Sequence, residues 1–289
     1  LGCWWGSMGV VHFLLLGGSP GAATVGLSYC IENYSRWKKE RREILESIVV
    51  VTTEEVLKGY VKSPKPAIVN KYGTIQKVKD LSREPFDSLR RFVNEEFGDL
   101  IEQNRGKIDT CKVRIDDLEY SVLSIASKLL EYKEKEVWLN ITGGMNPMTV
   151  QSLFTAYLGG IIAKIYYTYV PPEYVSLMKP PGENGSEKFN FIEVPMVKAE
   201  FDPAYFNILE IIKDEGGIIE TENLLSKLKS SGRSIDKHGL LKMRGHGVIA
   251  EDKNGKYTIL TDAGRTLLSL YENPIFKEYM QLVTNYGKV

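Results

Sequence analysis

Residues 136–149 read EVWLNITGGMNPMT, and residues 10–21 read VVHFLLLGGSPG. In each stretch an apolar run, typical of a buried parallel strand, ends in a glycine-rich turn that opens a helical pattern. Ligands of open parallel sheets bind outside the carboxyl ends of the strands, at the point where the strand order reverses. The two stretches therefore predict a ligand site built from two strand-to-helix turns.

The sequence around these stretches alternates between strand and helix patterns. We expect further strands at 48–51, 112–115 and 164–170, and helices at 21–34, 52–60, 85–103, 120–132 and 146–158. This alternation predicts an α/β fold, a Rossmann-like, mostly parallel sheet with helices on both faces.

The pattern changes near residue 200. Helices are expected at 205–213, 220–230 and 234–244, a hairpin at 248–260 with its turn at 252–255, and a closing helix at 261–272. Three helices, a hairpin and a helix indicate a winged helix-turn-helix. The sequence therefore predicts a ligand-binding domain at 8–200 and a winged helix-turn-helix domain at 201–289. Residues 1–7 (LGCWWGS) are interpreted as an expression remnant.

Composition narrows the function classes. Lys plus Arg and Asp plus Glu both number 37, so the net charge does not draw the chain to nucleic acid or to an anionic membrane. The apolar run 10–16 is too short to span a membrane. Three cysteines without a C-x-x-C pair, and only three histidines, argue against a metal site, a disulfide framework and a Ser-His-Asp triad. We expect a cytoplasmic protein.

Each glycine-rich turn offers backbone N–H groups and the positive end of a helix dipole to an anion. Hydroxyl and amide groups in the turns suit phosphate, ribose or base edges. Ordinary tight turns remain the alternative, more so for the first turn than for the second. The spacing fits neither a P-loop nor a dinucleotide fingerprint. The candidate ligand-binding residues are Gly17, Gly18, Ser19, Pro20, Thr142, Gly143, Gly144, Met145, Asn146, Met148 and Thr149.

The run TGGMNPM at 142–148 resembles the signature of the CRISPR-associated Rossmann-fold family, and Gly17-Gly18-Ser19-Pro20 is similar to the family's other ligand loop. That loop is usually written G-T-S-P, so Gly18 departs from it. The resemblance covers residues 10–197, and a winged helix behind such a domain is common in the family.

The resemblance implies a homodimer, with the helix at 149–162 at the interface, and a shared pocket for a cyclic oligoadenylate, usually cyclic tetra-adenylate. Some members cleave the ring they bind. In that chemistry a ribose 2′-OH attacks the adjacent phosphorus and leaves a 2′,3′-cyclic phosphate, without a metal ion or other cofactor.

By this resemblance, Ser19 contacts the scissile phosphate or orients the 2′-OH. Backbone donors at Gly18, Gly143 and Gly144 cradle phosphates, and Asn146 and Met148 shape the base or ribose pocket. Charge that develops at phosphorus needs a cation. Lys179 is the first candidate and Arg105 the second, although a solvated surface position is the ordinary alternative for either residue.

A ligand-controlled DNA-binding regulator is the competing function. Over 201–271, Lys and Arg number ten and so do Asp and Glu, which disfavours tight DNA binding. A dimerisation or lid module is a further alternative for this domain. Its candidate DNA contacts are Lys237, His238, Lys242 and Arg244 on the recognition helix, with Lys253 and Lys256 in the wing.

Overall fold

The computed structural model describes residues 9–32, 43–61, 67–69, 75–77, 84–171, 177–178, 190–195, 203–230 and 237–286. The chain divides into two compact units, residues 1–198 with 282–289, and residues 199–281. The expected remnant at 1–7 lies outside the described residues.

The first unit is built on a six-stranded sheet in the order β5-β2-β1-β6-β7-β8. Neighbouring strands are parallel, except that β8 pairs antiparallel with β7. This arrangement confirms the predicted Rossmann-like α/β class. The strands are β1 (Val10–Leu16), β2 (Ser47–Thr53), β5 (Ile108–Val113), β6 (Glu136–Asn140), β7 (Ile162–Tyr169) and β8 (Asn190–Val194).

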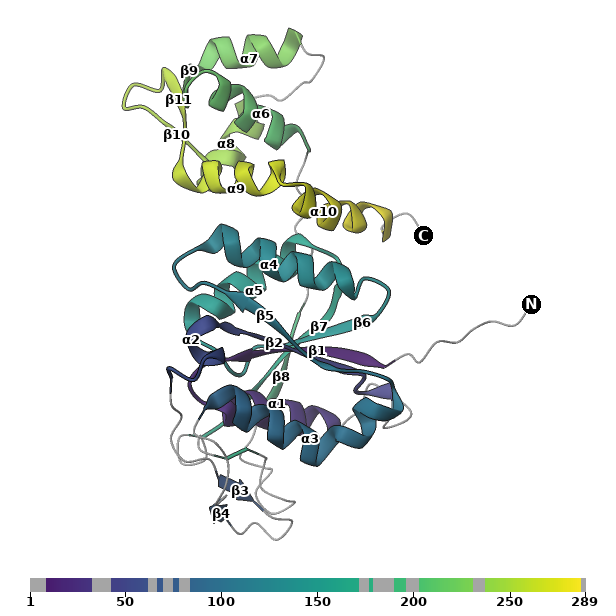
Figure 1. The fold of residues 1–289 in the computed structure, drawn as a ribbon. Coiled ribbons are helices and arrows are strands. Elements are labelled where there is room, and N and C mark those ends of the chain that lie inside the picture. Colours follow the sequence, from purple (N-terminus) through teal and green to yellow (C-terminus); the bar gives the residue numbers. More distant parts are fainter. Residues whose placement is uncertain are drawn as a thin grey trace, which may run out of the picture. The chain divides into compact units, whose positions relative to one another are not determined.

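Helices cover both faces of this sheet (Figure 1). Helices α1 (Pro20–Glu32) and α3 (Pro85–Gln103) pack together on one face, and α4 (Leu118–Glu131) and α5 (Asn146–Leu158) pack together on the other. The short helix α2 follows β2, and a small hairpin lies between α2 and α3. Their bounds are α2 (Glu54–Leu57), β3 (Ala67–Val69) and β4 (Ile75–Lys77).

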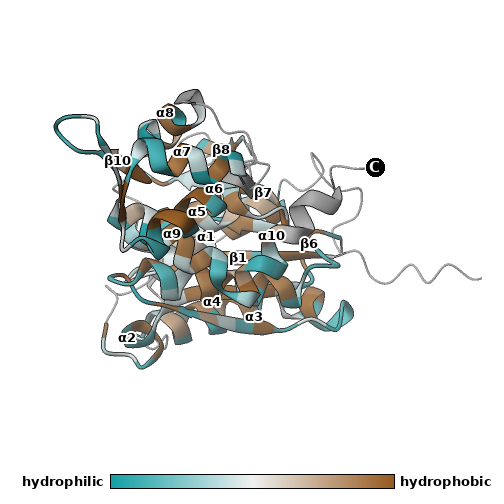
Figure 2. Ribbon diagram, turned by 90° about the horizontal axis from the view of Figure 1, so that it is seen from above, coloured by the Kyte–Doolittle hydropathy of each residue, from teal (hydrophilic) through white to brown (hydrophobic). Residues whose placement is uncertain are grey.

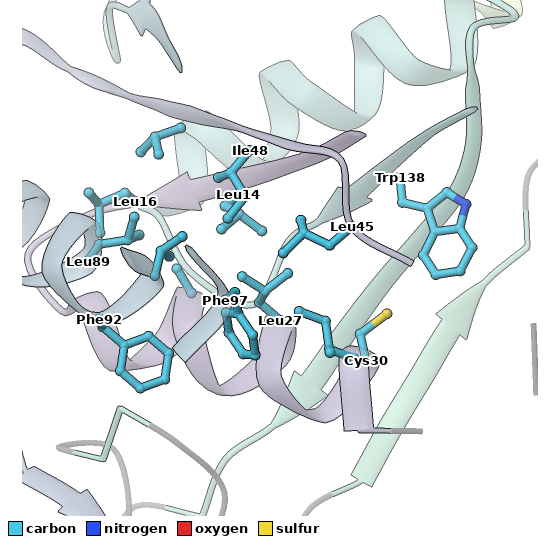
Figure 3. Close-up of a cluster of buried hydrophobic side chains, with 14 of the residues drawn as sticks. Leu14, Leu16, Leu27, Cys30, Leu45, Ile48, Leu89, Phe92, Phe97 and Trp138 are labelled. Atoms are coloured by element: carbon cyan, nitrogen blue, oxygen red, sulfur yellow. The ribbon is translucent and has the colours of Figure 1, made fainter. Parts of the chain in front are cut away.

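A hydrophobic core of the first unit lies between the sheet and the α1–α3 layer (Figure 3). Every residue of β1 is buried, as expected of a central strand covered on both faces. Helix α3 turns one apolar side to this core, where Leu89, Phe92 and Phe97 are almost completely buried.

The start of β5 differs from its expected place, whereas α5 has its expected bounds. Strand β5 begins at Ile108 rather than at 112, because pairing with β2 extends the strand into a half-polar stretch that carries no strong strand pattern. The helix expected at 146–158 has those bounds as α5, so the expected interface segment 149–162 extends four residues beyond the helix. Gly159 has an extended backbone and donates its N–H to Thr155 O over 3.1 Å, which closes the last turn.

The second unit contains a three-stranded antiparallel sheet, in the order β10-β11-β9, packed with helices. Strand β9 was not expected from the sequence. Thr261 Oγ1 accepts a hydrogen bond from Gly264 N over 3.0 Å and caps α9. Helix α9 carries both hydrophobic and hydrophilic residues (Figure 2). The elements are α6 (Pro203–Asp214), β9 (Ile218–Glu220), α7 (Thr221–Ser230), α8 (Lys237–Gly245), β10 (Ile249–Glu251), β11 (Tyr257–Leu260), α9 (Asp262–Glu272) and α10 (Pro274–Tyr286).

Candidate functional site

The two glycine-rich turns lie side by side at the reversal of strand order. From β1 the chain first adds β2 and β5 on one side, and then β6 and β7 on the other. One turn follows β1 and the other follows β6, the strand paired with β1. A Cβ atom on Gly17 would lie 3.3 Å from the carbonyl carbon of Gly144, so the two turns are in van der Waals contact.

Only glycine fits at the centre of the second turn. A Cβ atom on Gly143 would lie 2.1 Å from Leu15 O, which is far inside contact distance. Gly144 has φ +86°, a conformation that side chains with a Cβ rarely adopt. The backbone of this turn is therefore pressed onto the end of β1.

Each turn opens a helix whose first turn carries no acidic residue. Met145 caps α5 in an extended conformation, and its side chain makes no capping hydrogen bond. Backbone N–H groups in the first turn of a helix have no partner within that helix, and they attract anions. Ser19, which is half-buried, directly precedes α1. The arrangement presents two helix starts beside each other at one edge of the sheet.

The remaining residues of the second turn differ in exposure. Asn146 is exposed, Met145 and Thr149 are half-buried, and Met148 is fully buried. The Met148 methyl group lies 3.7 Å from where a Gly144 Cβ would stand, so this side chain supports the turn from the core. Thr149 Oγ1 donates to Met145 O at 3.5 Å.

Thr142 joins the second turn to the neighbouring strand. Its hydroxyl oxygen accepts a hydrogen bond from Thr168 N in β7 at 2.9 Å. Its backbone N–H donates to Asn140 Oδ1, also at 2.9 Å. The Thr142 hydroxyl therefore links the second turn to β7. In the first turn, Gly17 and Pro20 are buried, whereas Gly18 is half-buried.

The structure separates Arg105 from the two turns. Arg105 follows α3 and has φ 53°, and the next residues lead into the start of β5. Gly106 lies against the backbone of Glu46, just before β2 begins. Arg105 therefore lies at the amino edge of the sheet, about 20 Å along the six residues of β5 from the carboxyl edge. This distance removes Arg105 from the candidate site within one chain.

Lys179 lies outside the described residues, but its neighbour Met178 is fully buried. The hydroxyl of Thr24, in α1, donates to Met178 Sδ at 3.9 Å. The chain just before Lys179 is thus packed against the helix that the first turn opens.

Sequence reasoning missed Arg114, which follows β5 at the carboxyl edge. Its guanidinium carbon lies 4.2 Å from the centre of the Tyr120 ring, and its backbone carbonyl accepts from Gln151 Nε2 of α5 at 2.8 Å. The side chain is 62% exposed and forms a 3.7 Å ion pair with Asp117, which an anionic ligand would have to displace. A cation placed directly after a strand was the signal that could have identified it.

Two exposed aromatic side chains lie on segments that flank the two turns. Tyr60, 74% exposed, follows α2, and a Gly18 Cβ would lie 3.2 Å from the neighbouring Val61. Tyr169, 54% exposed, ends β7, the strand on the other side of β6. Aromatic rings of this kind offer stacking surfaces for nucleobases.

Within the described residues, no group of three or more His, Cys, Asp or Glu side chains is placed to hold a metal ion. Among the same residues, no helix combines the length and the apolar character that a membrane crossing requires.

The sequence of the chain has little similarity to those of known proteins. No family model and no curated protein matches the chain. Among solved structures, the chain is similar to Csm6 of Enterococcus italicus bound to cyclic hexa-2'-fluoro-hexa-dAMP, with 14% identity and a TM-score of 0.34. The match covers 83% of this chain and 56% of that one, so this chain corresponds to little more than half of the Csm6 protein. A TM-score of 0.34 is too low for this similarity to support an inference about the chain.

Proposed function

We propose that the first unit belongs to the CRISPR-associated Rossmann-fold family and binds a cyclic oligoadenylate, cyclic tetra-adenylate in particular. The observation that carries the proposal is the contact between the two glycine-rich turns at the reversal of strand order. Both turns open helices without an acidic residue in the first turn, which suits an anionic ring. The motifs TGGMNPM and GGSP support the same ligand.

We further propose that the protein is a homodimeric ring nuclease that switches off an antiviral signal. The ribose 2′-oxygen bonds to phosphorus as the bond to the 5′-oxygen breaks, and the 2′-OH proton is balanced by a proton on the departing 5′-oxygen. The products are linear and carry a 2′,3′-cyclic phosphate. This reaction needs an in-line geometry and stabilisation of charge at phosphorus.

The position of Ser19, directly before α1, supports this role. Ser19 would contact the scissile phosphate, while backbone N–H groups at Gly18, Gly143 and Gly144 hold the phosphates. Lys179 remains the proposed cation, and Arg114, at the carboxyl edge of the sheet, is a second candidate.

The proposal is tested by incubating the protein with labelled cyclic tetra-adenylate in EDTA and resolving the products. We expect linear products that end in a 2′,3′-cyclic phosphate. Replacement of Ser19 by Ala should slow cleavage by roughly 100-fold, while the affinity for the ring stays within about threefold.

Ser28→Ala is the matched control, because Ser28 lies in α1, the helix that Ser19 precedes, and its buried hydroxyl has no hydrogen-bond partner among the described residues. It should cleave like the wild type. Equal losses of affinity and rate in Ser19→Ala would rule out the role of Ser19 in catalysis. A bound ring that stays intact would instead favour a sensor.

The second candidate is a winged-helix transcription regulator that responds to the same ligand. It is favoured by the order α6, β9, α7, α8, β10, β11 with a three-stranded antiparallel sheet, the arrangement expected of a winged helix. Ion pairs of its basic side chains argue against DNA binding by this unit. Arg244, a candidate DNA contact, forms a 2.7 Å ion pair with Glu251, and Lys256 in the wing forms one of 3.3 Å with Glu220.

A further inference from the structure

Asn140 is a buried polar residue on an inner strand of the sheet. It ends β6, which lies between β1 and β7, and its side chain is inaccessible to solvent. Burial of an amide is unfavourable unless its donors and acceptor find partners. The partners of Asn140 therefore indicate what the residue contributes.

The Asn140 side chain connects the two halves of the candidate site. Its Nδ2 donates to Ala23 O, near the start of α1, at 3.1 Å. Its Oδ1 accepts from the backbone N–H of Thr142, at the start of the second turn, at 2.9 Å. One amide group is thus bonded to the helix that the first turn opens and to the first residue of the second turn.

The atoms around the Asn140 side chain are closely packed. Gly26 of α1 approaches so closely that a Cβ atom there would lie 2.7 Å from both Asn140 Nδ2 and Thr142 Oγ1. Thr142 Oγ1 is itself fixed by the backbone N–H of Thr168 at 2.9 Å. Helix α1, the second turn and β7 are therefore held in one arrangement around the amide.

We infer that Asn140 is a positioning residue that sets the spacing between the two helix starts, and so the affinity for an anionic ring, without touching the ligand. This inference rests on the proposed function, because it supposes that both turns contact one ligand. A displacement of about 1 Å in such a constellation can reduce a rate or an affinity by roughly 100-fold.

Asn140→Asp tests the inference, because aspartate has nearly the size and shape of asparagine but replaces the Nδ2 donor with an oxygen that donates only when protonated. Aspartate keeps an oxygen that accepts from Thr142 N, but its second oxygen faces the carbonyl of Ala23. When protonated, that oxygen can donate to the carbonyl again, and burial raises the pKa of such a carboxyl. We expect the variant to bind cyclic tetra-adenylate at least tenfold more weakly than the wild type at pH 8. Its affinity should recover as the pH falls to 6, while that of the wild type stays constant.

Thr155→Val is the matched structural control. Thr155 is fully buried, and its hydroxyl donates to Gln151 O at 2.8 Å within α5, away from the two turns. This variant should lose stability but keep wild-type affinity at both pH values. Gly26→Ala is a second test, because its methyl group pushes α1 from Asn140 without altering the amide. It should weaken binding without the pH dependence.

The outcomes separate the inference from the function on which it rests. A wild-type protein that does not bind the ring would overturn both. A wild-type protein that binds, together with Asn140→Asp and Gly26→Ala variants of unchanged affinity, would overturn only the role of Asn140. Circular dichroism at each pH confirms that the compared samples are folded.

Discussion

At the scale of single residues, the polar groups buried in the first unit form a directed chain of hydrogen bonds. His12 Nε2 lies 2.7 Å from Ile44 O, which can only accept, so this nitrogen carries the proton. His12 Nδ1 then accepts from the hydroxyl of Tyr166 at 2.8 Å. His12 thus connects the chain just before β2, at Ile44, with Tyr166 of β7.

His12 should make the stability of the first unit depend on pH. Burial lowers its pKa to about 4, below the ordinary value of 6.5. The unfolded state therefore binds the proton more readily than the folded state. The contribution of neutral His12 is complete above pH 6.5 and is lost as the pH falls toward 4, by up to about 3 kcal/mol.

Urea unfolding at pH 7.5 and pH 5 measures this effect. The wild type should lose more stability between the two pH values than His12→Gln, which has no group that titrates in this range. Equal losses in the two proteins would show that His12 does not set this dependence. Because carboxylates titrate in both proteins, the difference between them isolates the histidine.

At the scale of elements, the second turn places the start of α5 against the end of β1. The turn tolerates no side chain at its centre, so its shape and the position of α5 are linked. The shape depends on a positive φ at Gly144, where a Cβ atom would also lie 2.8 Å from Leu15 Cβ.

Gly144→Ala should therefore weaken binding of cyclic tetra-adenylate by at least roughly tenfold, since backbone strain and the contact with Leu15 shift the turn. Isothermal titration calorimetry measures the affinity. Gly98→Ala is the control, because Gly98 lies in α3 and, beyond its own helical turn, no atom of the described residues would lie within 4 Å of the added methyl group. That variant should gain about 0.5–1 kcal/mol of stability and bind normally. Normal affinity in Gly144→Ala would remove the second turn from the ligand site.

At the scale of the whole molecule, α5 is the proposed homodimer interface. Val150 of α5 is 62% exposed, and Ile115 and Leu118, near the start of α4, are 46% and 38% exposed. We expect Val150→Arg to convert the dimer into monomers in analytical ultracentrifugation, because like charges would meet across a two-fold axis. Asn94→Arg, a change at an exposed position of α3, should leave the dimer intact. A Val150→Arg dimer of unchanged stability would place the interface elsewhere.

The second unit should bind DNA weakly. Lys213, Lys227 and Arg265 form ion pairs with carboxylates, as do Arg244 and Lys256. Phosphates would have to displace these partners. Fluorescence anisotropy with a duplex should show low affinity and a shallow dependence on salt. Tight, sequence-specific binding would favour the regulator over the ring nuclease.

Much of the first unit could be predicted because its signals are local. The alternation of strand and helix indicated the fold class, and the glycines after two apolar runs located the turns. Strand β9 was not found because it has only three residues, and the start of β5 was not found because that stretch is half-polar; both strands form through pairing with another strand.

The sequence by itself determined the α/β class and the position of the two glycine-rich turns, because hydrophobic periodicity and the need for glycine act over a few neighbouring residues. Only the tertiary structure decided which residues share an edge of the sheet. It brought Gly17 against Gly144 and Asn140 against α1, buried Met148, and placed Arg105 at the opposite edge. Strand order and register join residues far apart in the chain, and no local pattern specifies them.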